Sequence, residues 1–214
     1  MNTKQIILWG AGTSRTIRPI WVAEELGLSY KLKPIGPRTG ETQTDAFTEI
    51  NPKQKIPLLQ DNDFFISESL AICRYLINQY GSARNIGAPI CAREKAREDE
   101  WLSFIYGELD ETSLYVIRRH EALAPIYGEA PNAIAAAKSY FQKHVSVAER
   151  RLKNRRFLIQ NKFGITDIFL TTCLAWADGC QIELSPLLKR YLFNMTERPA
   201  YKRAKTQNTP KIMN

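Results

Sequence analysis

The chain has few of the residues that build metal centres and disulfide frameworks. Its 214 residues include only four cysteines and two histidines. The cysteines are widely spaced and form no C-x-x-C pair, so the sequence indicates neither a zinc site nor a dithiol redox motif. Cys73 and Cys173 fall in apolar helical patterns, which predicts buried thiols. We expect no metal cofactor.

Long hydrophobic runs are also lacking. No stretch reaches the roughly 20 apolar residues that a membrane-spanning helix needs. Residues 1–5 lead directly into the strand-like stretch 6–9, without the basic region and long apolar segment of a secretory signal. These absences predict a cytoplasmic protein with reduced thiols and no membrane partner.

Acidic residues are outnumbered by basic ones, 22 to 30, which gives a net charge of +8. Such a charge favours anionic partners and would steer a small anion toward a positive cleft. The densest basic run, 150–156, is interrupted by Leu152 and followed by Phe157, and no nucleic-acid-binding motif accompanies it. We interpret the run as a solvated helix end and expect no nucleic-acid partner.

The first eighty residues alternate between strand and helix patterns. Strands are predicted at 6–9 and 30–34 and in a hairpin around the turn 61–63, and helices at 17–26, 46–50 and 69–80. Gly27 marks the end of the first of these helices. The stretch 81–89 holds two glycines and one proline, which is typical of a linker. We therefore divide the chain into domains 1–81 and 90–214.

Strand patterns fade beyond the linker. Apolar and aromatic residues at steps of three and four predict one long helix over 92–120. Further helices are expected at 133–152, 165–178, 186–193 and 200–204. At the start of 165–178, Gly164 stands at the N-cap and Asp167 can bond back to its backbone. The second domain is predicted to be all-helical.

One stretch, 51–59, has the features of a ligand site. Its Ile56-Pro57 bond could be cis, since a tertiary amide removes most of the trans preference, and such a turn exposes the Ile56 backbone. Past the hairpin, residues 67–69 begin a helical pattern, where unpaired N–H groups and the helix dipole favour a carboxylate. Glu68 could hold an amine. The expected ligand is a small peptide with an amino acid end.

These two stretches read Asn-Pro-x-x-Lys-Ile-Pro-x-Leu and Glu-Ser-x-Ala-Ile. At this spacing they resemble the glutathione site of the cytosolic, bacterial-type glutathione S-transferases. The resemblance implies an α/β thioredoxin-like N-terminal domain, an all-α C-terminal domain and glutathione as co-substrate. It assigns the cysteinyl part of glutathione to the Ile56 backbone and the turn to Pro57. It assigns the γ-glutamyl group to Glu68 and Ser69. Lys55 is expected to face either the glycine carboxylate or solvent.

Glutathione transfer requires a thiolate, whereas an ordinary thiol with a pKa of about 8.5 is mostly protonated at neutral pH. A hydroxyl at a helix N-terminus favours the anion. The loop 10–15 delivers two hydroxyls, and the resemblance places Ser14, or alternatively Thr13, at the catalytic position. Both could instead be simple N-cap residues. Arg15 and Arg18 could support this loop or a bound anion, or be surface charge.

The second substrate is expected between the domains, against the long helix, with Tyr106, Asp110 and Tyr115 as lining groups. In the bacterial beta class, His-Lys stands where this chain has Asp110-Glu111, and a cysteine stands in the first loop. This departure replaces positive with negative charge. Beta-class substrate preferences are therefore not assumed.

The resemblance implies an enzyme that conjugates glutathione to a small hydrophobic electrophile, as in detoxification, and that forms a homodimer. A second hypothesis is a glutathione- or ligand-binding protein of the same fold that performs no conjugation. A third is glutathione-dependent reductase or peroxidase chemistry. The sequence does not identify the electrophile.

Overall fold

The computed structural model describes residues 5–81, 86–159 and 162–209. It divides into two compact units, Met1–Ala88 with Glu197–Asn214, and Pro89–Thr196. Two sequence-based expectations lie outside the described residues. They are the absence of a secretory signal at residues 1–4 and the middle of the linker at residues 82–85. The sequence-based division assigns the C-terminal segment to the helical domain, whereas this segment packs with the N-terminal unit.

A four-stranded sheet forms the centre of the first unit. Its strands are β1 (Ile6–Trp9), β2 (Tyr30–Lys33), β3 (Leu58–Asp61) and β4 (Phe64–Ser67). Their order is β2-β1-β3-β4, with β1 parallel to β2 and antiparallel to β3, and with β3 and β4 forming the predicted hairpin. Strand β1 is paired on both sides, and its first three residues are buried, as expected for an apolar inner strand.

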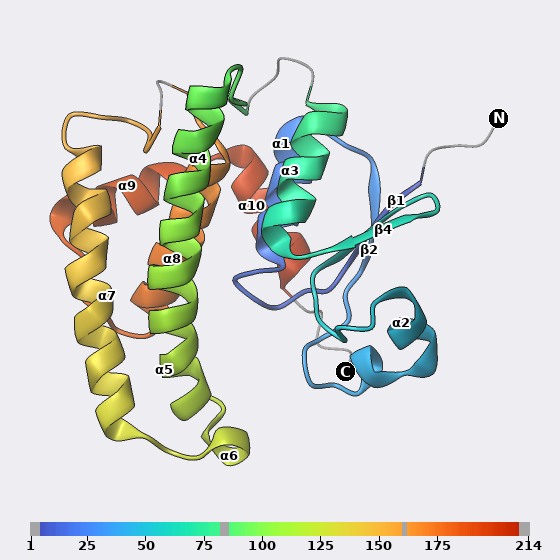
Figure 1. Cartoon of the computed structure of the whole chain (residues 1–214), viewed down its shortest axis with the longest axis horizontal. Helices are drawn as coiled ribbons and strands as arrows, with labels where there is room; N and C mark the ends of the chain where they lie inside the picture. Colours follow the sequence, from blue (N-terminus) through green and yellow to red (C-terminus); the bar gives the residue numbers. More distant parts are fainter. Residues whose placement is uncertain (1–4, 82–85, 160–161, 210–214) are drawn as a thin grey trace. The chain divides into compact units, whose positions relative to one another are not determined.

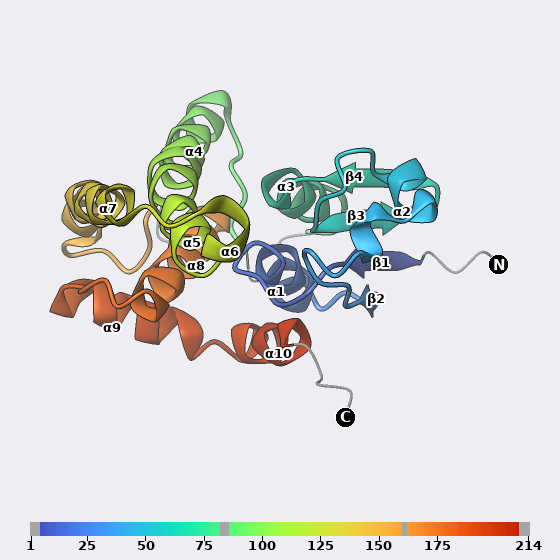
Figure 2. The ribbon, with the colours of Figure 1, turned by 90° about the horizontal axis from the view of Figure 1, so that it is seen from below.

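Helices complete the described part of this unit. They are α1 (Ile17–Leu26), η1 (Glu41–Gln43), α2 (Asp45–Ile50), α3 (Ser69–Tyr80) and α10 (Pro199–Asn208). Figure 1 and Figure 2 show α1 and α3 side by side on one face of the sheet, and α10 packs along α1. The fully buried Trp21 meets the ring of Tyr201 at 4.8 Å between centroids. Arg198, the N-cap residue of α10, also bonds to α1, with its Nε 2.6 Å from Glu25 Oε1.

The second unit is helical. It contains α4 (Ala92–Phe104), η2 (Ile105–Leu114), α5 (Tyr115–His120), α6 (Ala124–Tyr127), α7 (Pro131–Leu152), α8 (Ile165–Gly179) and α9 (Pro186–Thr196). The predicted long helix over 92–120 is present, and α7 lies beside it (Figure 1). Its central part, η2, is a π-helix with wider turns. Among the described residues, no helix is long and apolar enough to cross a membrane.

The start of α8 is organised by one buried carboxylate. Asp167 is fully buried, and its Oδ2 accepts from the Gly164 N–H at 2.9 Å, which confirms the expected return bond. Its Oδ1 also accepts from the Leu158 N–H at 2.9 Å and from the Tyr191 hydroxyl at 2.7 Å. Burial raises the pKa of Tyr191 well above its usual value, so this hydroxyl remains a donor. Asp167 therefore joins α8, α9 and the preceding loop.

Candidate functional site

Strand register brings three segments of the first unit to one edge of the sheet. Trp9, at the end of β1, pairs with Leu58, which pairs in turn with Ser67 at the end of β4. The loop after β1, the turn before β3 and the start of α3 therefore leave the sheet at the same edge. The candidate residues of this unit lie on these three segments, although they come from distant parts of the sequence.

The turn before β3 is fixed from inside. The Ile56-Pro57 peptide bond is cis, as the sequence allowed. Asn51 is 3% exposed, and its Nδ2 donates to the Lys55 carbonyl at 2.7 Å. Gln54 adopts a left-handed conformation, with φ of 53°, and its Nε2 donates to Thr48 Oγ1 at 3.0 Å. These bonds set the position of Ile56, whose side chain is only partly buried.

The start of α3 presents an acid and a buried hydroxyl. Glu68 is the N-cap residue and has an unusual φ of 74°. Its exposed carboxylate lies 3.0 Å from Lys53 Nζ, an ion pair that the sequence pattern did not indicate. The Ser69 side chain is buried, and its Oγ lies 3.5 Å from Nη1 of Arg18. Arg18 is fully buried, so the interpretation of this arginine as surface charge is wrong.

The two hydroxyl side chains of the first loop, Thr13 and Ser14, make different contacts. Helix α1 begins at Ile17, later than a cap at Ser14 would require. The Thr13 hydroxyl accepts from the backbone N–H groups of Arg15 at 3.2 Å and Thr16 at 3.0 Å, which is a capping role. Ser14 is half-buried, and its hydroxyl takes no part in these bonds. The two hydroxyls therefore differ in the bonds they make, and the role of Ser14 as the group that faces a ligand stays a prediction.

Neither a protein thiolate nor a metal is indicated beside these groups. Cys73 of α3 is fully buried, and burial raises the pKa of its thiol. The thiol is therefore protonated at neutral pH, in agreement with the predicted buried cysteine. Within 5–81, 86–159 and 162–209, no cluster of three or more His, Cys, Asp or Glu side chains could hold a metal ion.

The three residues expected to line a second-substrate site lie in or beside η2. Tyr106 and Tyr115 are partly exposed, whereas Asp110 is fully buried together with Leu109 and Leu114. The wider π-turn moves residues away from the face that an α-helical period assigns to them. The guanidinium of Arg119 lies 4.7 Å from the centroid of the Tyr115 ring. Contact of these residues with a substrate stays a prediction.

Comparison with known proteins identifies the family of this chain. The glutathione S-transferase N-terminal domain matches residues 4–78, and the C-terminal domain of the same enzymes matches residues 131–203. The chain belongs to the glutathione S-transferase family. Glutathione S-transferase theta-1 of Bos taurus is 29% identical over 79% of this chain and 72% of its own, and GstA of Escherichia coli O157:H7 is 26% identical over 72% and 74%.

A solved family member has the same fold. The theta class glutathione S-transferase from the citrus canker pathogen Xanthomonas axonopodis pv. citri, crystallised with glutathione bound, superposes with a TM-score of 0.80 at 26% identity. The superposition covers 94% of this chain and 97% of that one. The predicted fold, a thioredoxin-like domain and an all-helical domain, is confirmed.

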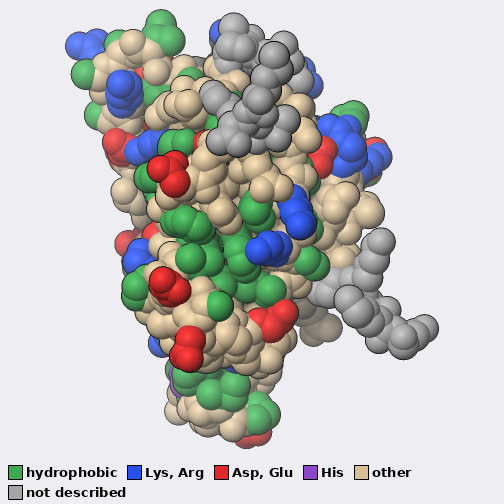
Figure 3. Space-filling view, turned by 90° about the vertical axis from the view of Figure 1, so that its right-hand side faces the viewer, with side chains coloured by type: hydrophobic (Ala, Val, Ile, Leu, Met, Phe, Trp, Pro, Cys, Tyr) green, Lys and Arg blue, Asp and Glu red, His purple; other side chains and the backbone are tan. Residues whose placement is uncertain are grey.

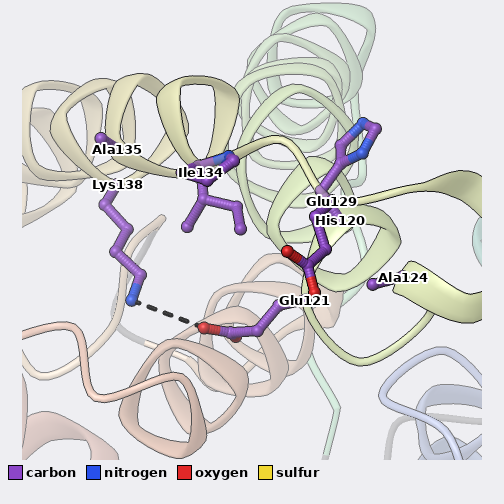
Figure 4. A pocket seen from close by; sticks show the side chains of 8 residues that line it. His120, Glu121, Ala124, Glu129, Ile134, Ala135 and Lys138 are labelled. Carbon is purple, nitrogen blue, oxygen red and sulfur yellow. Dashed lines mark ion pairs between the residues drawn. The ribbon is translucent and has the colours of Figure 1, made fainter.

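The helical unit also carries a groove of about 460 Å³ (Figure 4). Its lining comes from α5, α6, α7 and the loops on either side of α6, and includes His120, Glu121, Glu129 and Lys138. Lys138 Nζ lies 3.9 Å from Glu121 Oε1, and His120 Nδ1 lies 2.9 Å from the Gly128 carbonyl. None of the candidate glutathione S-transferase residues named above lines this groove.

Gly10 tests how tightly the first loop packs on the cis turn. At this residue φ is +106°, and an added Cβ would lie 2.6 Å from Ile56 Cβ, a backbone-attached atom that cannot turn aside. We expect Gly10→Ala to lower the free energy of unfolding by about 1–3 kcal/mol and to weaken glutathione binding by displacing Ile56. Thermal unfolding and calorimetric titration measure the two effects.

Gly27→Ala is the matched control, because φ is +63° there and no atom lies within 4 Å of the added Cβ. It should lose only about 1 kcal/mol of stability and keep wild-type affinity for glutathione. Equal behaviour of the two variants would show that the loop does not pack against Ile56 as described.

Proposed function

We propose that this chain is a glutathione transferase of the serine type, which conjugates the glutathione thiolate to a small hydrophobic electrophile. The observation that carries the proposal is the meeting of Ser14, the cis Ile56-Pro57 turn and the Glu68-Ser69 helix start at one edge of the sheet. A hydroxyl, an exposed peptide backbone and an anion-accepting helix end are the groups that a thiol tripeptide needs.

Ser14 stabilises the thiolate. Its hydroxyl donates to the sulfur, and such a hydrogen bond to a charged acceptor is worth about 1.5–3 kcal/mol. The N-terminus of α1, three residues away, adds the positive end of a helix dipole. Together they lower the pKa of the bound thiol, and the sulfur then attacks the electrophile and displaces its leaving group.

The remaining groups hold the tripeptide. The Ile56 backbone pairs with the cysteinyl residue, Ser69 and the first N–H groups of α3 receive the γ-glutamyl carboxylate, and Glu68 receives the amine. The amine must replace Lys53 at Glu68. Both side chains of that pair are more than half exposed, so breaking it costs at most about 1 kcal/mol. Lys55 is exposed and can approach the glycine carboxylate.

Substitutions at the start of α3 should weaken glutathione binding. We expect Ser69→Ala to raise the dissociation constant about tenfold, since a buried hydroxyl bonded to a carboxylate is lost. Glu68→Gln should raise it about threefold, because this carboxylate is exposed. Isothermal titration calorimetry measures both. Asp63→Asn removes the same charge from the exposed hairpin turn and should leave the affinity unchanged. Wild-type affinity in both α3 variants would refute this assignment.

We place the electrophile against the long helix of the second unit, with Tyr106, Asp110 and Tyr115 as the proposed lining groups. Aromatic rings suit a hydrophobic substrate. Assays with a panel of aryl halides, epoxides and peroxides would define the chemical class of the electrophile. Turnover of a peroxide alone would favour the peroxidase alternative over conjugation.

The protein is proposed to be a homodimer in the cytoplasm. On the face drawn in Figure 3, hydrophobic side chains gather near the centre, and charged side chains of both signs are scattered around them. The Phe64 ring is 43% exposed and packs on Tyr75 at 4.9 Å between centroids, an aromatic surface that a symmetric partner could cover. Light scattering at micromolar concentration should give twice the chain mass, and a value of 24.5 kDa would contradict the proposal.

Activity with a generic aryl halide tests the proposed function directly. The purified protein should bind immobilised glutathione and release halide only when glutathione is present. Binding without turnover of any electrophile in the panel would support the non-conjugating alternative. Absence of glutathione binding would reject both.

A further inference from the structure

The last residue of α10 reaches back to the loop that carries Ser14. Asn208 is 7% exposed, although it stands near the end of the described chain. Its Nδ2 donates to the Thr13 carbonyl at 3.1 Å, and its Oδ1 accepts from Thr16 Oγ1 at 2.6 Å. The Gly12 N–H donates to the Asn208 backbone carbonyl at 2.8 Å and lies 3.2 Å from its Oδ1. One side chain therefore holds three loop residues.

These contacts surround Ser14 on both sides in the sequence. The N–H groups of Gly10 and Ala11 donate to the Lys33 and Ile35 carbonyls at 2.8 and 3.1 Å, whereas the next residues, from Gly12 to Thr16, are held by Asn208. The Thr13 and Thr16 hydroxyls form a hydrogen bond of 3.0 Å. Because Thr16 also bonds to Asn208, this hydrogen bond connects Asn208 to the capping turn. The Ser14 hydroxyl is not part of this network, so Asn208 can act on it only through the backbone of the neighbouring residues.

Asn is well suited to this position. Its amide donates to one carbonyl and accepts from a hydroxyl and an N–H at the same time. Aspartate has the same shape but lacks the donor, and its charge would face the Thr13 carbonyl. Helix α10 is itself fixed to α1 by the buried Glu25, which Arg198 meets with two bonds of 2.6 and 2.8 Å. The helix that carries Asn208 is therefore itself tied to α1.

We propose that Asn208 is a positioning residue, which holds the first loop so that the Ser14 hydroxyl meets the glutathione sulfur. The inference rests on the proposed function. A loosened loop would spread the hydroxyl over many positions and reduce the fraction of complexes in which it stabilises the thiolate. Glutathione itself is held elsewhere, so its affinity should depend little on Asn208.

The test compares Asn208→Ala and Asn208→Asp with the control Gln207→Ala, the exposed neighbour in the same helix. We expect Asn208→Ala to raise the pKa of the bound glutathione thiol and to lower turnover at neutral pH about tenfold, with a change in the glutathione dissociation constant below about threefold. Asn208→Asp should show the same signature and covers the case in which Asn208→Ala does not fold. Gln207→Ala should match the wild type.

Two further measurements separate the possible failures. In a Ser14→Ala background, Asn208→Ala should add little to the loss of turnover, because both act through one hydroxyl. Amide hydrogen exchange of residues 12–16 in the glutathione-free protein should be faster in Asn208→Ala and unchanged in Gln207→Ala. A raised thiol pKa in Ser14→Ala with a wild-type pKa in both Asn208 variants would overturn the positioning role and leave the proposed function standing. If Ser14→Ala itself kept a wild-type pKa, the serine mechanism would fail, and the positioning role with it.

Discussion

Ser14→Ala should lower turnover at neutral pH roughly 10- to 150-fold, which corresponds to the loss of a hydrogen bond of about 1.5–3 kcal/mol to the thiolate. The loss should shrink as the pH approaches the unperturbed thiol pKa of about 8.5, since ionisation then no longer depends on the protein. The glutathione dissociation constant should change little, because Ile56, Glu68 and Ser69 hold the rest of the tripeptide. Steady-state kinetics from pH 6 to pH 9 measure the effect.

Two controls make this experiment specific. Ser29→Ala removes an exposed hydroxyl from the loop between α1 and β2 and should behave like the wild type. Thr13→Ala removes the capping bonds to Arg15 and Thr16 and should lower stability by about 1 kcal/mol without the pH signature. If instead Thr13→Ala carried that signature and Ser14→Ala did not, the catalytic hydroxyl would be that of Thr13. No effect of either variant would exclude hydroxyl activation.

Asp167→Ala should destabilise the helical unit more than any other single substitution considered for it. The substitution leaves three donors without their acceptor, namely the N–H groups of Leu158 and Gly164 and the Tyr191 hydroxyl. Since the carboxylate is fully buried, we expect a loss of about 3–5 kcal/mol. This corresponds to a fall of about 6–20 °C in the unfolding midpoint for a chain of this size. Differential scanning calorimetry measures it.

Asp178→Ala is the matched control, because it removes an exposed carboxylate from the same helix. It should change stability by no more than about 0.5 kcal/mol. Asp167→Asn should fall between the two, since the amide oxygen can keep the Leu158 and Tyr191 bonds while the amide nitrogen faces the Gly164 N–H. Equal midpoints for Asp167→Ala and Asp178→Ala would show that the capping carboxylate does not join α8 to its neighbours.

The elements of the fold could be predicted because local chemistry decides them. Apolar strand runs, the 3.6-residue helical period and the left-handed Gly27 cap gave β1, α1 and α3 at their observed bounds. The π-helix η2, which packs against α7 and α8, could not be predicted in this way, because a π-helix does not follow the 3.6-residue period. Asp110, which is expected to line a site, lies in this π-helix and is fully buried, and its contact with a substrate stays a prediction.

The candidate site was predictable to the extent that its residues occur in short motifs. The cis turn and the start of α3 each lie within a few residues, and register alone brings them together. Contacts that depend on tertiary packing leave no such pattern. Asn208 lies more than 190 residues from the loop that it holds, and the buried Arg18 looks like any helix-surface arginine in the sequence. The Lys53–Glu68 pair joins two exposed groups from separate turns.

The central claim is that this protein binds glutathione and lowers the pKa of its thiol through Ser14. The measurement that tests it most directly is a pH titration of the thiolate absorbance of glutathione bound to the wild-type protein and to Ser14→Ala. We expect an apparent pKa about 1–2 units below that of free glutathione in the wild type, and a value nearer to that of free glutathione in the variant, where only the α1 dipole remains. A bound thiol that titrates like free glutathione in the wild-type protein would contradict the account.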